Sequence, residues 1–376
     1  MSEADFLARI QRFAQTRLAQ AAPGWALGGA PEPGLWHDAA ALGLTGITTP
    51  QAHGGLGHSF DTLLKCSQAL AEVDFGFAMA LINTQNVCAR LCLSATDTLR
   101  NRYLPGILSG KISACTALTE PGAGTDFAAI TTRAEETPDG WQITGEKTWI
   151  VNGRHAGLAV VFAQCGAVGD AAGIGAFLVD LTQPTVKRYA INSGFAQETM
   201  GTGGFTLAQA PADLLLPPGT AFKSILIEIN AARTYVAAMC NAMLGAALAQ
   251  ARAYGAERLS FGKPLDQYAE WCRPLSLAQT DLAAARALTA QAAAQISAGQ
   301  DAQLAAAQAK IAATEAAQRH IPEMLHAMGA AGLLPHYCFT RHLAAAQTAG
   351  FTDGATSILR ARVARLTRAS TQNSTR

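Results

Sequence analysis

The spacing of apolar residues changes twice along this chain of 376 residues, and that change limits the fold more than any other feature. Up to about residue 110, leucines recur at spacings compatible with helices. The chain opens with Ser2 and Asp5 at the spacing of a helix capping box. The glycine-rich segment 48–57 is expected to be a loop, because a helix does not accept that density of glycine. We therefore predict a helical N-terminal region.

The middle of the chain has the short apolar runs that are typical of β-strands. Five runs have strand length: 130–137, 141–150, 158–162, 174–179 and 186–191. The triplet Pro138-Asp139-Gly140 separates the first two runs and predicts a hairpin, because these residue types favour turns. This part of the chain is therefore expected to be rich in β-structure.

Helical spacing returns after Pro217-Pro218-Gly219. Apolar residues at steps of three or four mark one face of the next helix: Val236, Cys240, Met243, Ala247, Ala251 and Tyr254. Alanine-rich stretches near 265–298 and 302–328 predict long helices in a tight bundle, since alanine favours helix and permits close packing. The expected architecture is α+β and multidomain. It has a helical domain at 1–111, a β domain at 112–215 and a helical domain at 216–376.

Composition excludes several classes of function. Only 15% of the residues are charged and the formal net charge is +1, which argues against nucleic acid or an anionic membrane as the main partner. No apolar run approaches the roughly 20 residues of a membrane span, and the acidic N-terminus does not resemble a signal peptide. The eight cysteines form no CxxC pair and the eight histidines show no metal-ligand spacing. We expect a soluble cytoplasmic protein with reduced thiols and no metal.

Three segments could carry chemistry. The loop Thr-Glu-Pro-Gly-Ala-Gly-Thr-Asp at 119–126 could present backbone N–H groups to a phosphate or a heterocycle, or could be an ordinary turn-rich connection. Trp149 ends a predicted strand, and it either packs in the core, the commoner use, or lies against a flat ring. Segment 258–264 lacks the spacing of a P-loop and has Pro264 where a hydroxyl residue is needed, which excludes a triphosphate site.

Together and in this order, these segments resemble the acyl-CoA dehydrogenase family of flavoproteins. Segment 50–57 is similar to the family's Pro-x-x-x-Gly-Gly-x-Gly loop, and 119–126 is similar to its most recognisable signature. The strand end at Trp149, segment 258–262 and the Gly-Ala-Ala-Gly segment at 329–332 complete the set. The resemblance covers essentially the whole chain. It implies a helical N-terminal domain, a middle β domain and a C-terminal helical bundle.

The resemblance implies FAD as the cofactor. The positions that match flavin-contacting residues of the family are Leu118, Thr119, Gly124, Thr125, Trp149, Val151, Arg258, Phe261, His326 and Ala330. Val151 stands where threonine is common, so only its backbone could bond the flavin. Arg258 and Phe261 would reach the FAD of a neighbouring subunit, the arginine through charge-assisted bonds to pyrophosphate. That role requires at least a dimer, and the family usually forms homotetramers built as dimers of dimers.

The family's chemistry also predicts the base. These enzymes remove a proton next to a thioester carbonyl and pass a hydride to the flavin, so the base is a carboxylate whose pKa is raised by burial. The family's Tyr-Glu-Gly-Thr segment matches residues 352–355, which places Asp353 at the catalytic position. An aspartate holds its carboxylate roughly 1.5 Å closer to the backbone, and a misplacement of about 1 Å can cost on the order of a hundredfold in rate. Some members of the same fold do use aspartate. The alternative is that Asp353 caps a helix starting near Ala355.

Three more residues are assigned to the substrate site by the resemblance. Arg233 matches an arginine that organises the active site of the family; a salt-bridged helix residue is the alternative. Thr352 and Gly354 flank the base, and Thr352 replaces the usual tyrosine. The family's Arg-Asp pair before this loop matches Ala344-Ala345. These replacements indicate a remodelled substrate pocket.

The sequence thus predicts an FAD-dependent oxidoreductase that introduces an α,β double bond into an acyl-CoA or carrier-bound acyl thioester. By resemblance, electron-transfer flavoprotein would take up the electrons. Two alternatives stay open. One is a flavin oxidase or monooxygenase of the same fold that acts on a small acidic substrate, and the other is a non-catalytic partner subunit of a heteromeric acyl-CoA dehydrogenase.

Overall fold

The computed structural model describes residues 2–192 and 197–374. The chain forms two compact units. The helical unit comprises Met1–Ala30, Leu64–Phe75 and Glu228–Arg376, and the barrel unit comprises Pro31–Leu63 and Gly76–Ile227. No helix in the described part of the chain is both long and apolar enough to cross a membrane.

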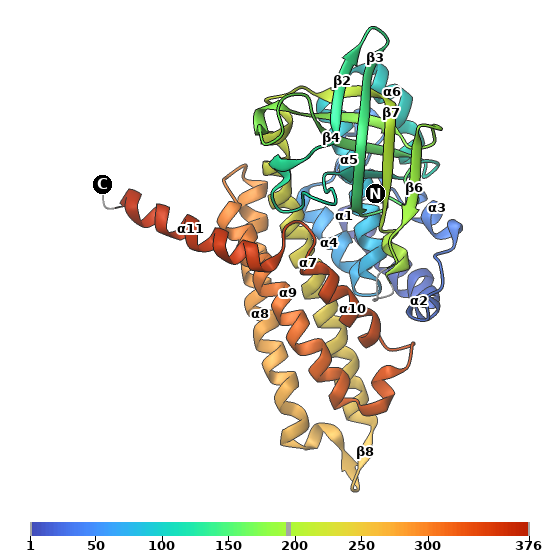
Figure 1. The fold of residues 1–376 in the computed structure, drawn as a ribbon. Helices are drawn as coiled ribbons and strands as arrows, with labels where there is room; N and C mark the ends of the chain where they lie inside the picture. The colour runs from blue at the N-terminus through green and yellow to red at the C-terminus, as the bar shows by residue number, and fades with distance from the viewer. Residues whose placement is uncertain (1, 193–196, 375–376) are drawn as a thin grey trace. The chain divides into compact units, whose positions relative to one another are not determined.

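The barrel unit contains a seven-stranded sheet. Its strands are β1 (Ala114–Ala117), β2 (Arg133–Thr137), β3 (Gly140–Ile150), β4 (Leu158–Gln164), β5 (Ile174–Asp180), β6 (Val186–Ala190) and β7 (Gly203–Leu216). The hydrogen-bonded order runs β4, β2, β3, β7, β5 and returns to β4, so five strands close into a ring. β1 pairs in parallel with β4, and β6 pairs antiparallel with β7. Figure 1 shows β2, β3 and β7 side by side.

Both faces of β4 are buried, which explains its unbroken apolar sequence. Leu158, Val160 and Phe162 belong to one hydrophobic cluster, with residues of the helices α5 (Phe75–Ser94) and α6 (Asp97–Leu108). The alternate residues of β4 belong to a second cluster, which also contains residues of β3 and β7. The sheet is therefore the core of this unit and holds its connecting loops on a rigid support.

The predicted hairpin is confirmed, with Thr137 paired to Gly140 across the turn. Its first strand begins at Arg133 rather than at residue 130, because the N–H groups of Thr131 and Thr132 are donated to a side chain instead of a neighbouring strand. The expected strands at 158–162, 174–179 and 186–191 are confirmed as β4, β5 and β6. The strands β1 and β7 were not expected.

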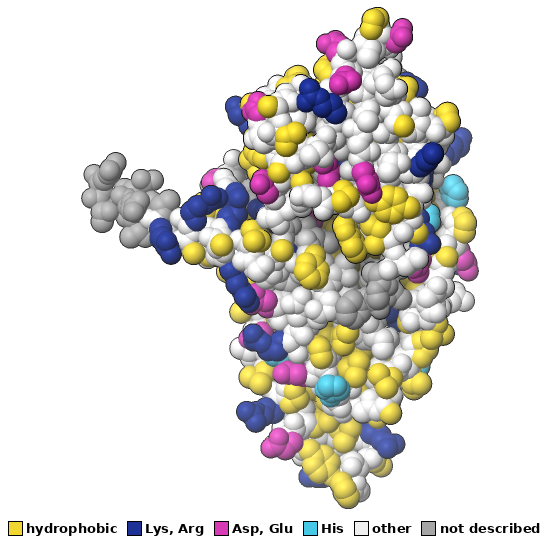
Figure 2. Space-filling model, viewed as in Figure 1, with side chains coloured by type: hydrophobic (Ala, Val, Ile, Leu, Met, Phe, Trp, Pro, Cys, Tyr) yellow, Lys and Arg dark blue, Asp and Glu magenta, His cyan; other side chains and the backbone are white. Residues whose placement is uncertain are grey.

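The helical unit contains most of the helices of the C-terminal region. Its helices include α1 (Glu3–Phe13), α2 (Ala19–Ala26), α8 (Ala269–Ser297), α9 (Gln303–Ala327), α10 (Phe339–Ala349) and α11 (Thr356–Ser374). The capping box at Ser2 and Asp5 forms as predicted. In Figure 1, α9 lies against α8, α10 and α11. Figure 2 shows Lys and Arg side chains gathered along α11.

The helix α3 (Pro33–Ala41) belongs to the barrel unit. The residues of α4 (Phe60–Ala71) and of α7 (Ala221–Glu257) are divided between the two units. The face of α7 predicted from its spacing is buried at Val236, Cys240 and Met243. The α+β architecture, with helical, β and helical segments in that order, is confirmed.

Candidate active site

A buried ion pair joins two of the sequence motifs in the barrel unit. Lys147 of the Glu-Lys-Thr-Trp segment lies 2.8 Å from the carboxylate of Glu120 in the Thr-Glu-Pro loop. Lys147 also donates to the carbonyl of Leu118 at 2.9 Å, and the N–H of Thr148 donates to the carbonyl of Thr119 at 3.0 Å. Two segments separated by nearly thirty residues are therefore fixed to each other at the end of β1 and β3.

The Glu120 carboxylate has a full set of partners. Besides Lys147, it accepts hydrogen bonds from the N–H and hydroxyl of Thr131 and from the N–H of Thr132. Burial alone would raise the pKa of Glu120, but the Lys147 charge and these hydrogen bonds outweigh it and lower the pKa to about 2. Glu120 is therefore a permanently ionised anchor for the loop rather than a group that exchanges protons near neutral pH.

This anchor occupies the carbonyls of Leu118 and Thr119 but leaves other expected flavin-contacting groups open. Trp149 adopts a left-handed backbone conformation (φ 56°) and exposes 59% of its surface, so the core-packing reading of this residue is wrong. Gly124 and Thr125 are exposed, and a Cβ added at Gly124 would meet nothing within 4 Å. No partner of the Thr119 or Thr125 hydroxyl is found among the described residues. An exposed aromatic ring beside unpartnered donors fits a flat polar cofactor.

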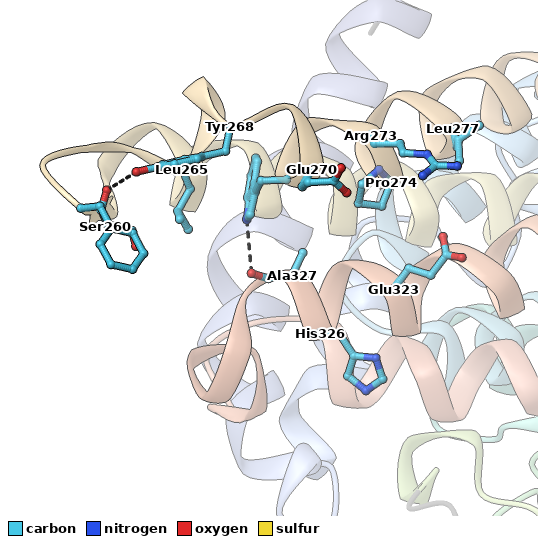
Figure 3. A pocket seen from close by; sticks show the side chains of 12 residues that line it. Ser260, Leu265, Tyr268, Glu270, Arg273, Pro274, Leu277, Glu323, His326 and Ala327 are labelled. Atoms are coloured by element: carbon cyan, nitrogen blue, oxygen red, sulfur yellow. Dashed lines mark hydrogen bonds between the residues drawn. The ribbon is translucent and has the colours of Figure 1, made fainter.

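A second group of predicted cofactor residues meets at a pocket in the helical unit. The pocket has a volume of about 770 Å³, and Phe261 and His326 both line it. Figure 3 shows its walls: residues from the segment before α8 and from α8 on one side, and residues of α9 on the other. The Tyr268 hydroxyl donates to the Ser260 carbonyl and the Trp271 indole donates to the Ala327 carbonyl, which fixes both walls.

A two-residue turn places Phe261 at the edge of this pocket. The strands β8 (Leu259–Ser260) and β9 (Lys263–Pro264) form a minimal hairpin. Phe261 and Gly262 both have positive φ (47° and 83°), as a type I′ turn requires. The Phe261 ring is 98% exposed.

Two other predicted residues lie outside the set that lines the pocket. Arg258 is exposed directly before the hairpin, and no partner of its guanidinium is found among the described residues. Ala330 is exposed in the short helix η7 (Gly329–Leu333). Arg258 lies two residues before the first lining residue, Ser260, and Ala330 lies three residues after the last, Ala327. The structure by itself does not assign a ligand to either residue.

The predicted substrate residues meet in the loop between α10 and α11. Asp353 and Gly354 adopt left-handed conformations in succession, with φ of 51° and 102°. Arg233 of α7 donates through Nε to the Asp353 backbone carbonyl at 3.1 Å and through Nη1 to the Asn230 side chain at 3.1 Å. The Thr352 hydroxyl donates to the Ala349 carbonyl. Arg233 is thus bonded to the loop backbone, not salt-bridged to its neighbours.

The Asp353 carboxylate itself is left without a partner. Among the described residues it accepts no hydrogen bond, and in particular none from the first turn of α11, so the helix-cap alternative is not supported. The side chain is half-buried. Desolvation raises the pKa of Asp353, and the opposing charges of Lys310 and Arg233 only partly offset this. A carboxylate in these surroundings binds a proton more tightly than an exposed aspartate does.

Sequence reasoning missed Lys310. This residue of α9 is completely buried, and its ammonium group donates to the Gly354 carbonyl at 2.5 Å. Desolvation lowers its pKa to about 8. Its position in an alanine-rich helix was the available signal, because Ala306, Ala313 and Ala317 on neighbouring turns are also buried. A lysine on that face must point into the core.

Comparison with known proteins identifies the family. Residues 2–111 match the N-terminal domain of acyl-CoA dehydrogenases, residues 115–210 the middle domain and residues 222–367 the C-terminal domain. The chain belongs to the acyl-CoA dehydrogenase family. It is therefore an FAD-dependent oxidoreductase that acts on CH–CH bonds, as the sequence predicted.

Named relatives span nearly the same length. The short-chain-specific acyl-CoA dehydrogenase of Megasphaera elsdenii is 28% identical and covers 94% of both chains. The CarC subunit of the caffeyl-CoA reductase–Etf complex of Acetobacterium woodii is 28% identical, over 79% of this chain and 80% of its own. The solved structure of butyryl-CoA dehydrogenase from Megasphaera elsdenii superposes with a TM-score of 0.91, at 26% identity and 97% coverage of each chain.

The residues present fit the cofactor of this acyl-CoA dehydrogenase. The barrel unit supplies an exposed tryptophan and open loop donors, and the helical unit supplies a pocket with an exposed phenylalanine at its edge. No group of three His, Cys, Asp or Glu side chains in the described part of the chain is placed to bind a metal ion. The chemistry of these donors suits an aromatic heterocycle with phosphate groups.

Proposed function

We propose that this acyl-CoA dehydrogenase uses Asp353 to remove the α-proton of an acyl thioester. One observation carries the proposal: both cations near Asp353 are bonded to backbone carbonyls, and the carboxylate remains free. The raised pKa of the Asp353 carboxyl makes it a stronger base than an exposed aspartate. Bound FAD would supply the acceptor for the hydride of the adjacent carbon.

The other residues of the loop would orient the base. Arg233 fixes the carbonyl of Asp353, and Thr352 fixes the end of α10. A Cβ added at Gly354 would be in van der Waals contact with the Arg233 guanidinium and the Leu359 side chain, both at 3.6 Å. We assign Arg233, Thr352 and Gly354 to the substrate site. Glu120 is excluded as the base, because its carboxylate is saturated by hydrogen bonds and the pKa is lowered to about 2.

Two sets of residues would hold FAD. The set in the barrel unit is Leu118, Thr119, Gly124, Thr125, Trp149 and Val151. The set in the helical unit is Arg258, Phe261, His326 and Ala330. We propose that Arg258 and Phe261 of the second set serve the FAD of another copy in a homo-oligomer, a dimer of dimers, supported by the exposure of Phe261 at the tip of its hairpin. The three domains proposed from the sequence, at 1–111, 112–215 and 216–376, each enclose one of the matched family ranges.

We propose an acyl-CoA or a carrier-bound acyl thioester as substrate and an electron-transfer flavoprotein as electron acceptor. The relative from Acetobacterium woodii is named as part of an Etf complex, which supports the acceptor. The small side chains of Ala344 and Ala345, both buried in α10 before the base loop, support a pocket of altered shape. A cytoplasmic location remains part of the proposal.

Anaerobic absorption spectra test this function. The purified protein is mixed with straight-chain, branched and alicyclic acyl-CoA thioesters, and the oxidised flavin band is followed. At least one thioester should bleach the band, and Asp353→Asn should slow the bleaching by about 10²- to 10⁴-fold. Asp97→Asn, on the exposed first turn of α6, is the matched control and should leave the rate unchanged.

Three results would contradict the proposal. Bleaching of Asp353→Asn at the unaltered rate would remove Asp353 from the mechanism. Oxygen consumption without an added acceptor would favour a flavin oxidase or monooxygenase. A protein that is colourless until a second chain is added would favour a non-catalytic partner subunit.

A further inference from the structure

The carbonyl groups of the loop at 350–355 accept hydrogen bonds from two buried cations on different helices. Arg233 of α7 donates to the Asp353 carbonyl at 3.1 Å, and Lys310 of α9 donates to the Gly354 carbonyl at 2.5 Å. Both cations lie close enough to the Asp353 carboxylate to affect it electrostatically, yet neither forms an ion pair with it. Their donors are directed at the backbone.

The loop needs such support because its conformation is unfavourable. Asp353 and Gly354 are consecutive residues with positive φ, a region that glycine adopts freely and aspartate adopts only occasionally. The N–H and hydroxyl of Thr356 donate to the Gly350 carbonyl and fix the two ends of the loop. Between those ends, Arg233 and Lys310 are the side chains that hold the backbone of Asp353 and Gly354.

A lysine at position 310 is energetically unfavourable. Its side chain is fully buried in a helix whose neighbouring buried residues are alanines, and a buried ammonium group without an anion partner is unfavourable. The titratable groups that face it are Asp353, the Cys240 thiol of α7 and Arg233, while Arg362 of α11 in turn faces Arg233. An apolar side chain would pack here without the desolvation cost. The lysine is therefore best explained by what it does to the loop.

We propose that Lys310 is a positioning residue for the base. Its ammonium group holds the Gly354 carbonyl, which fixes the left-handed turn, and it places a positive charge beside the Asp353 carboxylate without bonding it. The carboxylate thus keeps both oxygens available for the proton of the substrate. This inference rests on the proposed role of Asp353.

A stability measurement tests the proposal without turnover. The free energy of unfolding is measured against pH for the unaltered protein and for Asp353→Asn, and the difference between them reports the folded-state pKa of Asp353. Because that pKa is raised above 3.8, the folded state binds the proton more tightly than the unfolded state. The difference in unfolding free energy therefore falls as the pH rises from 3.8 to the folded pKa and is constant above it. We call this pH range the stability window.

The same pair of measurements is repeated with Lys310→Met, which removes the charge and the donor. Loss of the nearby cation makes the Asp353 carboxyl harder to ionise. The stability window should therefore extend to higher pH by about one unit or more. Where Lys310→Met does not fold, Lys310→Gln takes its place, because it retains a donor and removes only the charge. Lys310→Arg, which retains the charge, should leave the window close to its original position.

Flavin reduction gives the second measurement. With the thioester that bleaches the unaltered protein fastest, Lys310→Met should reduce the rate about tenfold to a hundredfold, as expected for a base displaced by about 1 Å. The pH at half-maximal rate should move upward with the stability window. The control is Thr289→Val in α8, a buried threonine whose hydroxyl donates to the Ala285 carbonyl. It should lower stability while the window and the pH profile stay in place.

The outcomes separate the two proposals. If Lys310→Met and Lys310→Gln lower stability but leave both pH dependences unmoved, Lys310 is only a packing residue and the inference is wrong. If Asp353→Asn bleaches at the unaltered rate, the proposed base is wrong, whereas the stability window still decides whether Lys310 acts on Asp353.

Discussion

Two lysines in the described part of the chain are completely buried, each close to one carboxylate, but the pKa of one carboxylate is lowered and that of the other is raised. Lys147 lies in the barrel unit beside Glu120, and Lys310 lies in the helical unit beside Asp353. Burial lowers the pKa of both lysines to about 8. The difference lies in the acceptor: Lys147 bonds the carboxylate itself, and Lys310 bonds a backbone carbonyl next to the carboxylate.

The acceptor decides what the carboxylate can do. Glu120 receives direct hydrogen bonds, its pKa is lowered, and it fixes two loops to each other. Asp353 receives none, desolvation dominates, and its pKa is raised. A buried lysine near a carboxylate thus accompanies an anchor in one unit and, in the proposed function, the catalytic base in the other. A buried lysine near a carboxylate cannot be interpreted until its hydrogen-bond acceptor is known.

The largest effect is expected from Lys147→Met. It leaves the Glu120 carboxylate buried without its cation, which typically costs about 3–5 kcal/mol of unfolding free energy. Urea denaturation followed by circular dichroism measures the loss. Adding Glu120→Gln to this variant should restore part of the stability, since it removes the uncompensated charge and its amide oxygen can still accept from Thr131. Lys310→Met breaks no ion pair, so it should lose less unfolding free energy than Lys147→Met. An equal loss would contradict the proposed difference between the two lysines.

Acidification is expected to have an intermediate effect, first on the rate of flavin reduction and then on stability. Glu120, with its pKa lowered to about 2, contributes stability that is fully present above pH 4.5 and is lost as the pH falls toward 2. Asp353, with its raised pKa, is protonated first. Flavin reduction should therefore slow about tenfold per pH unit, equivalent to about 1.4 kcal/mol, while the fold persists. Rapid-mixing rates and circular dichroism at the same pH values check this order, and coincident loss of both would contradict it.

The smallest effect is expected from Lys65→Met. Lys65 is solvent-exposed and pairs with Glu3 at 3.5 Å, and exposed ion pairs contribute roughly 0–1 kcal/mol. The same substitution at three lysines therefore separates a saturated buried ion pair, a buried backbone contact and a surface pair. A loss at Lys65 as large as that at Lys147 would show that the effect of the substitution does not depend on burial.

Much of the fold followed from the sequence because its signals are local. The turn triplet at 138–140 defined the hairpin, and alanine-rich runs defined α8 and α9 within a few residues. β7 was not predicted, because its 14 residues include Pro211 and paired glycines and show no alternation of apolar and polar residues. The strand is specified by its pairing with β3, β5 and β6.

The candidate site was only half accessible to the same reasoning. The motifs around Thr119, Trp149 and Asp353 have recognisable sequences. Lys310 lies 44 residues before the carbonyl it bonds, and Glu120 lies 27 residues from Lys147. Spacing rules describe neighbours along one helix or strand, so contacts of this range required the packed structure.

The hairpin tip at Phe261 has a consequence for how the protein can change. A bulky residue in a left-handed turn costs on the order of 1 kcal/mol or more, and an aromatic ring in water gains nothing from burial. For the isolated chain, glycine would be the better residue at this position. Laboratory selection for thermal stability or expression yield alone would therefore favour loss of this ring, whereas, on the proposed role of Phe261 in binding FAD, selection that requires a bound flavin would retain it. Phe261 is a residue where the two selective pressures oppose each other.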